Sequence, residues 1–337
     1  MNRRALLQAL GASALVAGCS RSGSDSLHSD IKVGMSTPAD PVHNGAYAWV
    51  EACLQVLEEA GLGTRLYPNS AIGGERERTI QTQLGLLELN VTGNDEIGRW
   101  SPMSHASARP FLVDSYDHMD RILDETPYLE RISADLEPYG LRLVDFVYTG
   151  SMVGLFTRGR PVRTLEDMQA LRLRVLSAAD MDLLNAWQVR GVQVAWEEVA
   201  QALQTGMVDA YLNPPNVAPM FGHGSVLDYF TDLRMGPAAR LVVASTRWLD
   251  TLDPRERDVL ERGFAAGRAA NRSWTRNTLE RDRARLEEIG VEWIEPDPEQ
   301  RREWVEASEA IEPGRWEDPE ISAEYRRWVE ETREADS

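Results

Sequence analysis

Cysteine is scarce in this 337-residue chain, which contains only Cys19 and Cys53. Cys19 falls in an N-terminal segment whose sequence predicts covalent processing, as described below, so no disulfide is expected in the mature chain. In "WVEACLQVLEEAG", Cys53 stands at helical spacing from Val50 and Leu57. This pattern is typical of a cysteine packed in a hydrophobic core, and we expect Cys53 to be buried rather than a nucleophile.

Positive charge is also in short supply. The chain carries 36 Lys and Arg against 54 Asp and Glu, which gives a formal net charge of −18 and a pI of about 4.8. Such a field repels nucleic-acid phosphates, which excludes nucleic acid as a partner. It also repels a small anion at long range, so any anion-binding site must be a local cationic feature.

Signatures of catalysis and of cofactor binding are missing. "GHGSV" at 222–226 lacks the spacing of a G-x-S-x-G nucleophile motif, and "GLG" at 61–63 lacks the third glycine of a dinucleotide-binding loop. The five histidines, at positions 28, 43, 105, 118 and 223, include no pair at metal-ligand spacing on one helix. We therefore expect no enzymatic activity, no cofactor and no metal.

What the chain does carry at its N-terminus is the pattern of an export signal. "MNRRALLQALGASALVAGCS" begins with Arg3 and Arg4, continues with an apolar stretch too short to span a membrane, and ends in "VAGC", which matches the bacterial lipobox. The arginine pair fits either a twin-arginine signal or a Sec signal that happens to carry two arginines. We expect a signal over 1–18, a lipid on Cys19, and a flexible tether over 19–30 that holds the protein to a membrane outside the cytoplasm.

The body of the chain alternates between strand and helix patterns. Residues 31–94 follow the order β-α-β-α-β, and residues 141–215 show a second α/β alternation. This order predicts two open, largely parallel sheets, and the 319 residues that follow residue 18 are enough for two domains.

A long helical pattern begins at the N-cap Asp253 and continues to about Ile289. An unbroken helix of this length would measure about 55 Å, which exceeds the diameter of one domain. Either Gly263 or Gly267 breaks the helix, or it runs across both domains.

Two arginines interrupt an apolar strand pattern. In "ALRLRVLSA", residues 170–178, Arg172 and Arg174 alternate with leucine and valine. Either they lie on the wet face of a surface strand, or one is held in a cleft as the partner of an anion. A guanidinium offers a planar set of donors that matches a carboxylate in a bidentate manner, and it stays charged at any relevant pH.

Around these residues the chain resembles the DctP-type substrate-binding proteins of TRAP (tripartite ATP-independent periplasmic) transporters. "LEDMQALRLRVLS" is similar to the family's "peDLkGlKiRvp", and "EEVAQALQTGMVDAYLNPP" is similar to "E-x-y-x-aLQtGvvDGqeNP". "YPNSAIGGERERTIQTQLGLLELNVTG" and "RPFLVDSYDHMDRILD" resemble two further segments of the family, and the resemblance extends over about 31–289.

This resemblance implies the fold, which is a two-domain α/β fold like that of periplasmic binding proteins, with a long helix bridging both domains. We place domain I at 31–151 plus about 240–279, and domain II at 152–239 plus about 280–334.

The resemblance also implies ligand-binding residues. The arginine of the family's "KiRv" corresponds to Arg174, which would form the salt bridge to a ligand carboxylate, and the asparagine of "eNP" corresponds to Asn213, which would contact the same carboxylate. Three further candidates come from their places at strand ends. Trp196 and Tyr211 either stack on a ligand or belong to ordinary packing, and Asn94 could offer a polar contact from domain I.

The chain also departs from the family pattern. Arg172 matches a position that the family often fills with lysine, and we interpret it as structural. Many members carry a second arginine that would fall near Gly154, and none stands there. Leu176 replaces the proline of "Rvp", and Ala210 replaces the glycine of "DG". The missing arginine weakens any transfer of dicarboxylate or sialic-acid specificity.

Taken together, these features predict a periplasmic, lipid-anchored receptor of a TRAP-type transporter. It would bind a small organic acid by domain closure and hand it to the membrane permease subunits, with no cofactor and with membrane contact through the lipid anchor alone. The alternative is a lipoprotein that presents its ligand to a sensor kinase.

Overall fold

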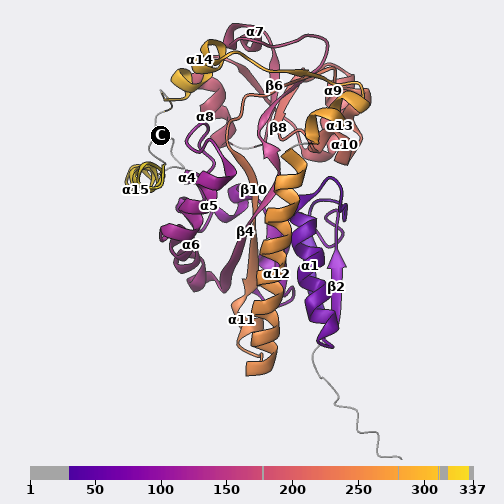
Figure 1. Ribbon diagram of the computed structural model, residues 1–337, viewed down its shortest axis with the longest axis vertical. Coiled ribbons are helices and arrows are strands. Elements are labelled where there is room, and N and C mark those ends of the chain that lie inside the picture. The colour runs from indigo at the N-terminus through magenta and orange to yellow at the C-terminus, as the bar shows by residue number, and fades with distance from the viewer. Residues whose placement is uncertain (1–29, 177, 280, 310, 312–317, 334–337) are drawn as a thin grey trace, which may run out of the picture.

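Two lobes, one above the other in Figure 1, make up the computed structural model, and each lobe is built around its own sheet. The structure describes residues 30–176, 178–279, 281–309, 311 and 318–333. The expected signal, Cys19 and nearly all of the tether therefore lie outside the described residues.

The first lobe contains a five-stranded sheet of order β2-β1-β3-β10-β4. Its strands are β1 (Ile31–Met35), β2 (Thr64–Tyr67), β3 (Leu89–Thr92), β4 (Leu141–Met152) and β10 (Pro237–Ser245). β1 pairs in parallel with β2 and β3, whereas β10 is antiparallel to β3 and β4. Because β10 starts at the boundary with the second lobe, its antiparallel pairing places the carboxyl ends of β1 and β3 at that boundary.

The second lobe contains a six-stranded sheet of order β11-β9-β5-β8-β6-β7. Its strands are β5 (Gly154–Thr157), β6 (Arg172–Val175), β7 (Arg190–Gln193), β8 (Ala210–Asn213), β9 (Tyr229–Thr231) and β11 (Glu292–Ile294). β6 is parallel to β7 and β8, and the first residue of β5, Gly154, lies opposite the last residue of β8, Asn213. Since β5 follows β4 directly at the boundary, the carboxyl ends of β6, β7 and β8 face the first lobe.

The parallel strands of both sheets thus direct their carboxyl ends toward each other, which is where open α/β sheets bind ligands. The chain segments that cross the boundary are tied together as well. Val153, between β4 and β5, donates its N–H to Gly236 O and accepts from Met235 N, both at 3.0 Å. This pair of bonds joins the β4–β5 connection to the β9–β10 connection at the point where the lobes meet.

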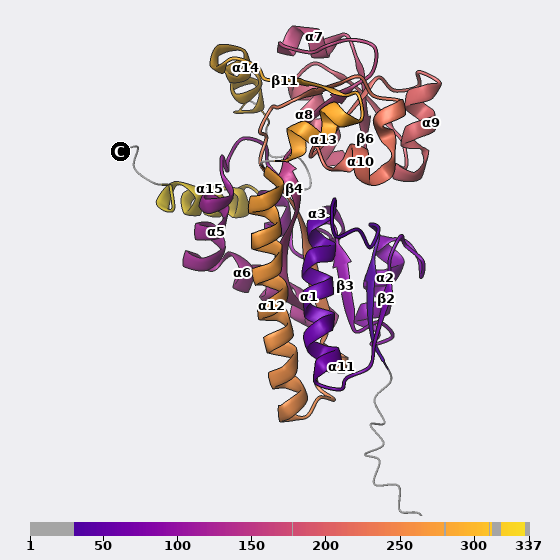
Figure 2. The ribbon, with the colours of Figure 1, turned by 45° about the vertical axis from the view of Figure 1, so that its right-hand side comes forward.

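Helices cover the sheets of both lobes (Figures 1 and 2). Those of the first lobe are α1 (Gly45–Glu59), α2 (Glu75–Gln83), α3 (Asn94–Ile97), α4 (Pro102–Ala106), α5 (Tyr116–Glu125), α6 (Tyr128–Leu136), α11 (Thr246–Leu249), α12 (Pro254–Leu279) and α15 (Pro319–Glu331). Those of the second lobe are α7 (Leu165–Gln169), α8 (Ala178–Ala186), α9 (Val199–Gln204), α10 (Val217–Phe221), α13 (Asp282–Glu288) and α14 (Pro298–Glu309).

Helix α12 begins where the sequence predicts the long helix, but it ends at Leu279 and not near Ile289, and the separate helix α13 begins at Asp282. The expected N-cap of α12 is present, because Glu256 N donates to Asp253 Oδ1 at 2.8 Å and Asp253 N donates to Glu256 Oε2 at 2.9 Å. Neither Gly263 nor Gly267 breaks the helix, which runs along the first lobe to Leu279. Figure 2 shows α13 continuing from its upper end into the second lobe.

The two glycines allow α12 to lie close to α1 instead. A Cβ atom on Gly263 would lie 3.2 Å from Cys53 Sγ, and one on Gly267 would lie 2.8 Å from the ring of Trp49. Cys53 is fully buried in this contact, as expected, and burial raises the pKa of its thiol to about 12. A thiol in such a place stays protonated and unreactive.

Helix α15 is where the expected domain limits and the structure differ. We placed 280–334 in the second domain, but Tyr325, Trp328 and Val329 of α15 pack in the hydrophobic cluster around the first sheet. The sequence could not reveal this placement, because the apolar face of an amphipathic helix does not specify which of two cores it covers.

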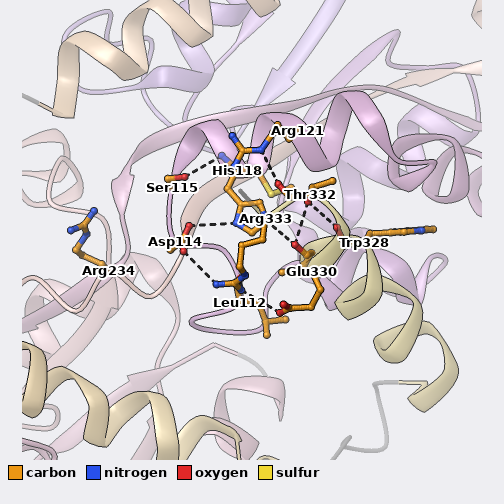
Figure 3. A network of polar contacts seen from close by, with 12 residues as sticks. Leu112, Asp114, Ser115, His118, Arg121, Arg234, Trp328, Glu330, Thr332 and Arg333 are labelled. Carbon is orange, nitrogen blue, oxygen red and sulfur yellow. Dashed lines mark hydrogen bonds and ion pairs between the residues drawn. The ribbon is translucent and has the colours of Figure 1, made fainter. Parts of the chain in front are cut away.

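Polar contacts from α5 and the loop before it fasten the end of α15 (Figure 3). Arg121 Nε donates to Thr332 O at 2.8 Å, and the His118 ring lies 3.0 Å from Val329 O. Arg333, just after the helix, forms an ion pair with Asp114 at 3.6 Å. The last helix is therefore held to the first lobe by its backbone as well as by its apolar face.

Gly267→Ala is expected to lower the free energy of unfolding by about 1–3 kcal/mol, because the added methyl group would overlap the ring of Trp49. Helix propensity alone predicts the opposite sign, since alanine is favoured over glycine by about 1 kcal/mol. Denaturant unfolding measures the difference. The exposed Ala269→Gly is the control and should lose about 1 kcal/mol through propensity alone. A Gly267→Ala protein as stable as the wild type would contradict the close packing of α1 and α12.

Candidate functional site

Arg174 lies near the carboxyl end of β6, at the boundary between the lobes. Its Nε donates to Val194 O at 3.0 Å, and its guanidinium lies over the ring of Trp196, 5.5 Å from the ring centroid. Its Nη2 is buried and has no hydrogen-bonding partner among the described residues. A buried donor on a permanent charge is unfavourable without an acceptor, so this atom marks a place where an anion would be stabilised.

The charges around Arg174 come from both lobes. Burial lowers the pKa of its guanidinium, and the carboxylates of Asp180, Glu197 and Asp95 oppose that shift. Asp180 and Glu197 belong to the second lobe, whereas Asp95 lies in α3 of the first. Arg174 therefore interacts electrostatically across the boundary even without a ligand.

Arg172, two residues earlier on the same strand, has a different environment. Its Nε donates to Asp209 Oδ2 at 2.9 Å and its Nη2 donates to Asp209 Oδ1 at 2.8 Å, a bidentate ion pair. The carboxylate of Asp209 also accepts from the backbone N–H of Arg172 at 3.0 Å. This pairing supports the structural role that we expected for Arg172, and it leaves Arg174 as the arginine of this strand with an unused donor.

The ring of Trp196 packs against the Arg174 guanidinium, and the ring of Tyr211 packs against Trp196. Trp196 meets Tyr211 edge to face, with ring centroids 5.8 Å apart, and the Tyr211 hydroxyl lies 3.1 Å from His223 Nδ1. The structure thus brings together Arg174, Trp196 and Tyr211. Tyr211 has no exposed surface here, so its side chain positions Trp196, whereas Trp196 itself is only partly buried.

The two asparagines predicted from the sequence lie on opposite sides of the boundary. Asn213 ends β8 and is half-buried, opposite Gly154. Asn94 is the first residue of α3, directly after the turn that follows β3, and its Oδ1 is buried without a hydrogen-bonding partner. Both residues stand where the carboxyl ends of the parallel strands face each other.

Sequence reasoning missed an ion pair in the first lobe. Arg240 of β10 donates from Nη1 to Glu75, which also accepts from Ser36 Oγ at 2.9 Å and from Gly93 N at 3.1 Å. Burial opposes ionisation of Glu75, but Arg240 and these hydrogen bonds outweigh it and hold the pKa of the carboxyl below its usual range. Arg240 and Glu75 are 165 residues apart in the sequence, so no local sequence pattern predicts their pairing.

Asp95 was missed as well. Its side chain is 42% exposed, and its Oδ1 lies 3.8 Å from His105 Nδ1. Incomplete solvation between the lobes, together with the carboxylates of Asp180 and Glu75, raises the pKa of Asp95 to about 6, while Arg240 and Arg174 act in the opposite direction. Asp95 therefore interacts electrostatically with an arginine of each lobe.

The unused donor of Arg174 gives this arrangement a place where an anion can bind. In the described part of the chain, no group of three or more His, Cys, Asp and Glu residues could hold a metal ion. A search of the same residues finds no helix that is long and apolar enough to cross a membrane.

The comparison with protein families decides the relationship. The model of the bacterial extracellular solute-binding proteins, family 7 (DctP), matches residues 33–313. The chain belongs to this family. The match confirms the resemblance to DctP-type proteins and covers the strands that carry Arg174 and Asn213.

Curated relatives of this solute-binding protein are distant. It is 27% identical to the sialic acid-binding periplasmic protein SiaP of Vibrio cholerae over 195 residues, which cover 56% of this chain and 59% of that protein. It is 23% identical to the C4-dicarboxylate-binding periplasmic protein DctP of Rhodobacter capsulatus over 275 residues, 80% of each chain.

Solved structures confirm the two-domain fold. A TRAP periplasmic solute-binding protein of Anaerococcus prevotii with bound D-glucuronate has a TM-score of 0.81 at 21% identity, covering 90% of this chain and 98% of that one. One from Sulfurospirillum deleyianum with bound succinate has a TM-score of 0.81 at 18% identity, covering 90% and 99%. These neighbours bind different classes of acid, so the shared fold alone does not specify a ligand.

Arg174→Met is expected to leave the ligand-free protein as stable as the wild type or up to about 1 kcal/mol more stable, because it removes a partly paired buried charge and keeps the apolar stem. Arg172→Met should lower the free energy of unfolding, because it leaves Asp209 without its bidentate partner. Urea unfolding of the three ligand-free proteins tests this. Equal losses in both variants would contradict their different roles.

Proposed function

We propose that this protein is the extracytoplasmic solute receptor of a TRAP-type transporter, which binds a small carboxylate-bearing organic acid between its lobes and delivers it to a membrane permease. The observation that carries the proposal is the buried, unpartnered Nη2 of Arg174 at a strand end that faces the other lobe. A ligand carboxylate supplies the missing acceptor, and a charge-assisted bond of this kind is among the stronger ones.

Binding follows from the positions of the candidate residues. Arg174 holds one carboxylate, the Asn213 amide donates to it from the end of the neighbouring strand, and Trp196 keeps the guanidinium in place. Asn94 contacts the ligand from the first lobe. A ligand that touches both lobes stabilises the closed arrangement and shifts the population toward it, without a cofactor or a catalytic step.

The lobes correspond to two domains that close on the ligand. We assign 31–151 and about 240–279 to domain I and 152–239 and about 280–309 to domain II, with α15 added to domain I because it packs there. The hinge lies at the crossing of Val153 with Gly236, where two hydrogen bonds join the connections.

Arg174→Ala is expected to abolish binding, because the neutral Asn213 amide alone would not compensate the charge of the carboxylate. A one-site ligand at a hundredfold excess over its Kd stabilises a protein by about 2.7 kcal/mol. A thermal-shift screen against small organic acids should show this stabilisation in the wild type and lose it in Arg174→Ala. The neighbouring Arg172→Ala is the matched control and should keep it. Stabilisation that persists in Arg174→Ala would refute the carboxylate clamp, and no stabilising acid at all would refute the proposed function.

We also propose that the receptor is a lipoprotein, anchored through Cys19 and a tether over 19–30. Cys19→Ser removes the thiol that the lipid modifies, so the exported variant is expected in the soluble extracytoplasmic fraction, whereas the wild type sediments with membranes. Cell fractionation with immunoblotting distinguishes the two. Wild-type protein that is wholly soluble would contradict the anchor.

A further inference from the structure

The wall of the first lobe that faces Arg174 carries a carboxylate. Asp95 belongs to α3, which begins just past the carboxyl end of β3 at the boundary, and it interacts electrostatically with Arg174 of the other lobe and with Arg240 of its own. Its side chain is 42% exposed, and its Oδ1 lies 3.8 Å from His105 Nδ1. Its carboxylate oxygens are therefore accessible to a ligand, unlike those of a carboxylate whose oxygens are both engaged in a close ion pair.

Two other cations near this wall, Arg240 and Arg78, are not available to a ligand. A Cβ atom on Gly93, two residues before Asp95, would lie 3.0 Å from Glu75 Oε2 and 3.8 Å from Arg240 Nη1, which places that ion pair beside α3. Glu75 neutralises Arg240. Arg78, behind Glu75, donates to Asn90 and to Gly73 O, and its Nη2 has no partner among the described residues. Unlike Arg174, which is partly exposed, Arg78 has no exposed surface, so a ligand cannot reach it.

A ligand that spans the boundary would therefore meet different groups at its two ends. At Arg174 it meets a donor that requires an acceptor. At the first lobe it meets acceptors, the carboxylate of Asp95 and the buried Oδ1 of Asn94. A second ligand carboxylate at that end would lie against the like charge of Asp95, which strongly disfavours its binding. A hydroxyl or ammonium group would instead donate hydrogen bonds to the Asp95 carboxylate and to Asn94 Oδ1.

We propose that this site selects monocarboxylates whose far end carries hydroxyl or ammonium donors and rejects dicarboxylates, with Asp95 as the residue that makes the distinction. The proposal rests on the proposed function and names its substrate class. It assigns specificity to a first-lobe carboxylate, while Arg174 supplies the affinity for the acid group common to both classes.

Pairs of probes that match in length and differ only at the far end test the proposal. Gluconate and glucarate form a six-carbon pair, and 4-hydroxybutanoate and succinate form a four-carbon pair, to which 4-aminobutanoate adds an ammonium end. Isothermal titration calorimetry on the full protein should show the monocarboxylate of a pair binding at least tenfold more tightly than its dicarboxylate. In Asp95→Asn the ratio should shrink by tenfold or more, mainly because the dicarboxylate binds better.

Asp117→Asn is the matched control, because Asp117 is an exposed carboxylate in the first turn of another helix of the same lobe. It should keep the wild-type ratio. A wild-type preference for the dicarboxylate, or a ratio that Asp95→Asn leaves unchanged, overturns the inference while Arg174-dependent binding leaves the proposed function intact. If no probe of either pair binds, and no organic acid shows Arg174-dependent binding, both proposals fail together.

Discussion

The buried Nη2 of Arg174, which has no partner among the described residues, is the constraint on which the proposed binding site depends. A guanidinium cannot lose its charge at physiological pH, so its buried donor must be satisfied from outside the fold. The second lobe satisfies Nε through Val194 O and supports the plane with Trp196, but it provides nothing for Nη2. On the proposed function, the missing acceptor is a ligand carboxylate that enters at the boundary.

The rest of the fold serves to keep this donor in one place. The parallel strands of both sheets end at the boundary. The polar residues at the ends of β3, β6 and β8 therefore reach the boundary without long connecting loops. Close packing of α12 on α1 at Gly267 gives the first lobe a stiff flank, and the Arg240–Glu75 pair fixes charge next to α3. A preorganised site of this kind loses little entropy on binding.

Much of this could be predicted from the sequence, because strand and helix periods are local. Alternation predicted two largely parallel sheets, but both sheets are mixed, because β10 pairs antiparallel with β3 and β4 and β5 pairs antiparallel with β8 and β9. The places of Arg174 and Asn213 at strand ends pointed to ligand binding. The sequence left open whether Gly263 or Gly267 breaks the long helix, since a glycine that admits a neighbouring helix looks the same as one that ends a helix. Arg240 and Asp95 escaped notice because their positions depend on the register of β10 against β3 and on how the two lobes face each other.

The most direct test of the account is a crystal structure of the protein with a bound monocarboxylate. The account predicts a carboxylate oxygen about 2.7–2.9 Å from Arg174 Nη2, with the far end of the ligand directed at Asp95. A ligand whose carboxylate lies elsewhere, with Nη2 still without an acceptor, would contradict it.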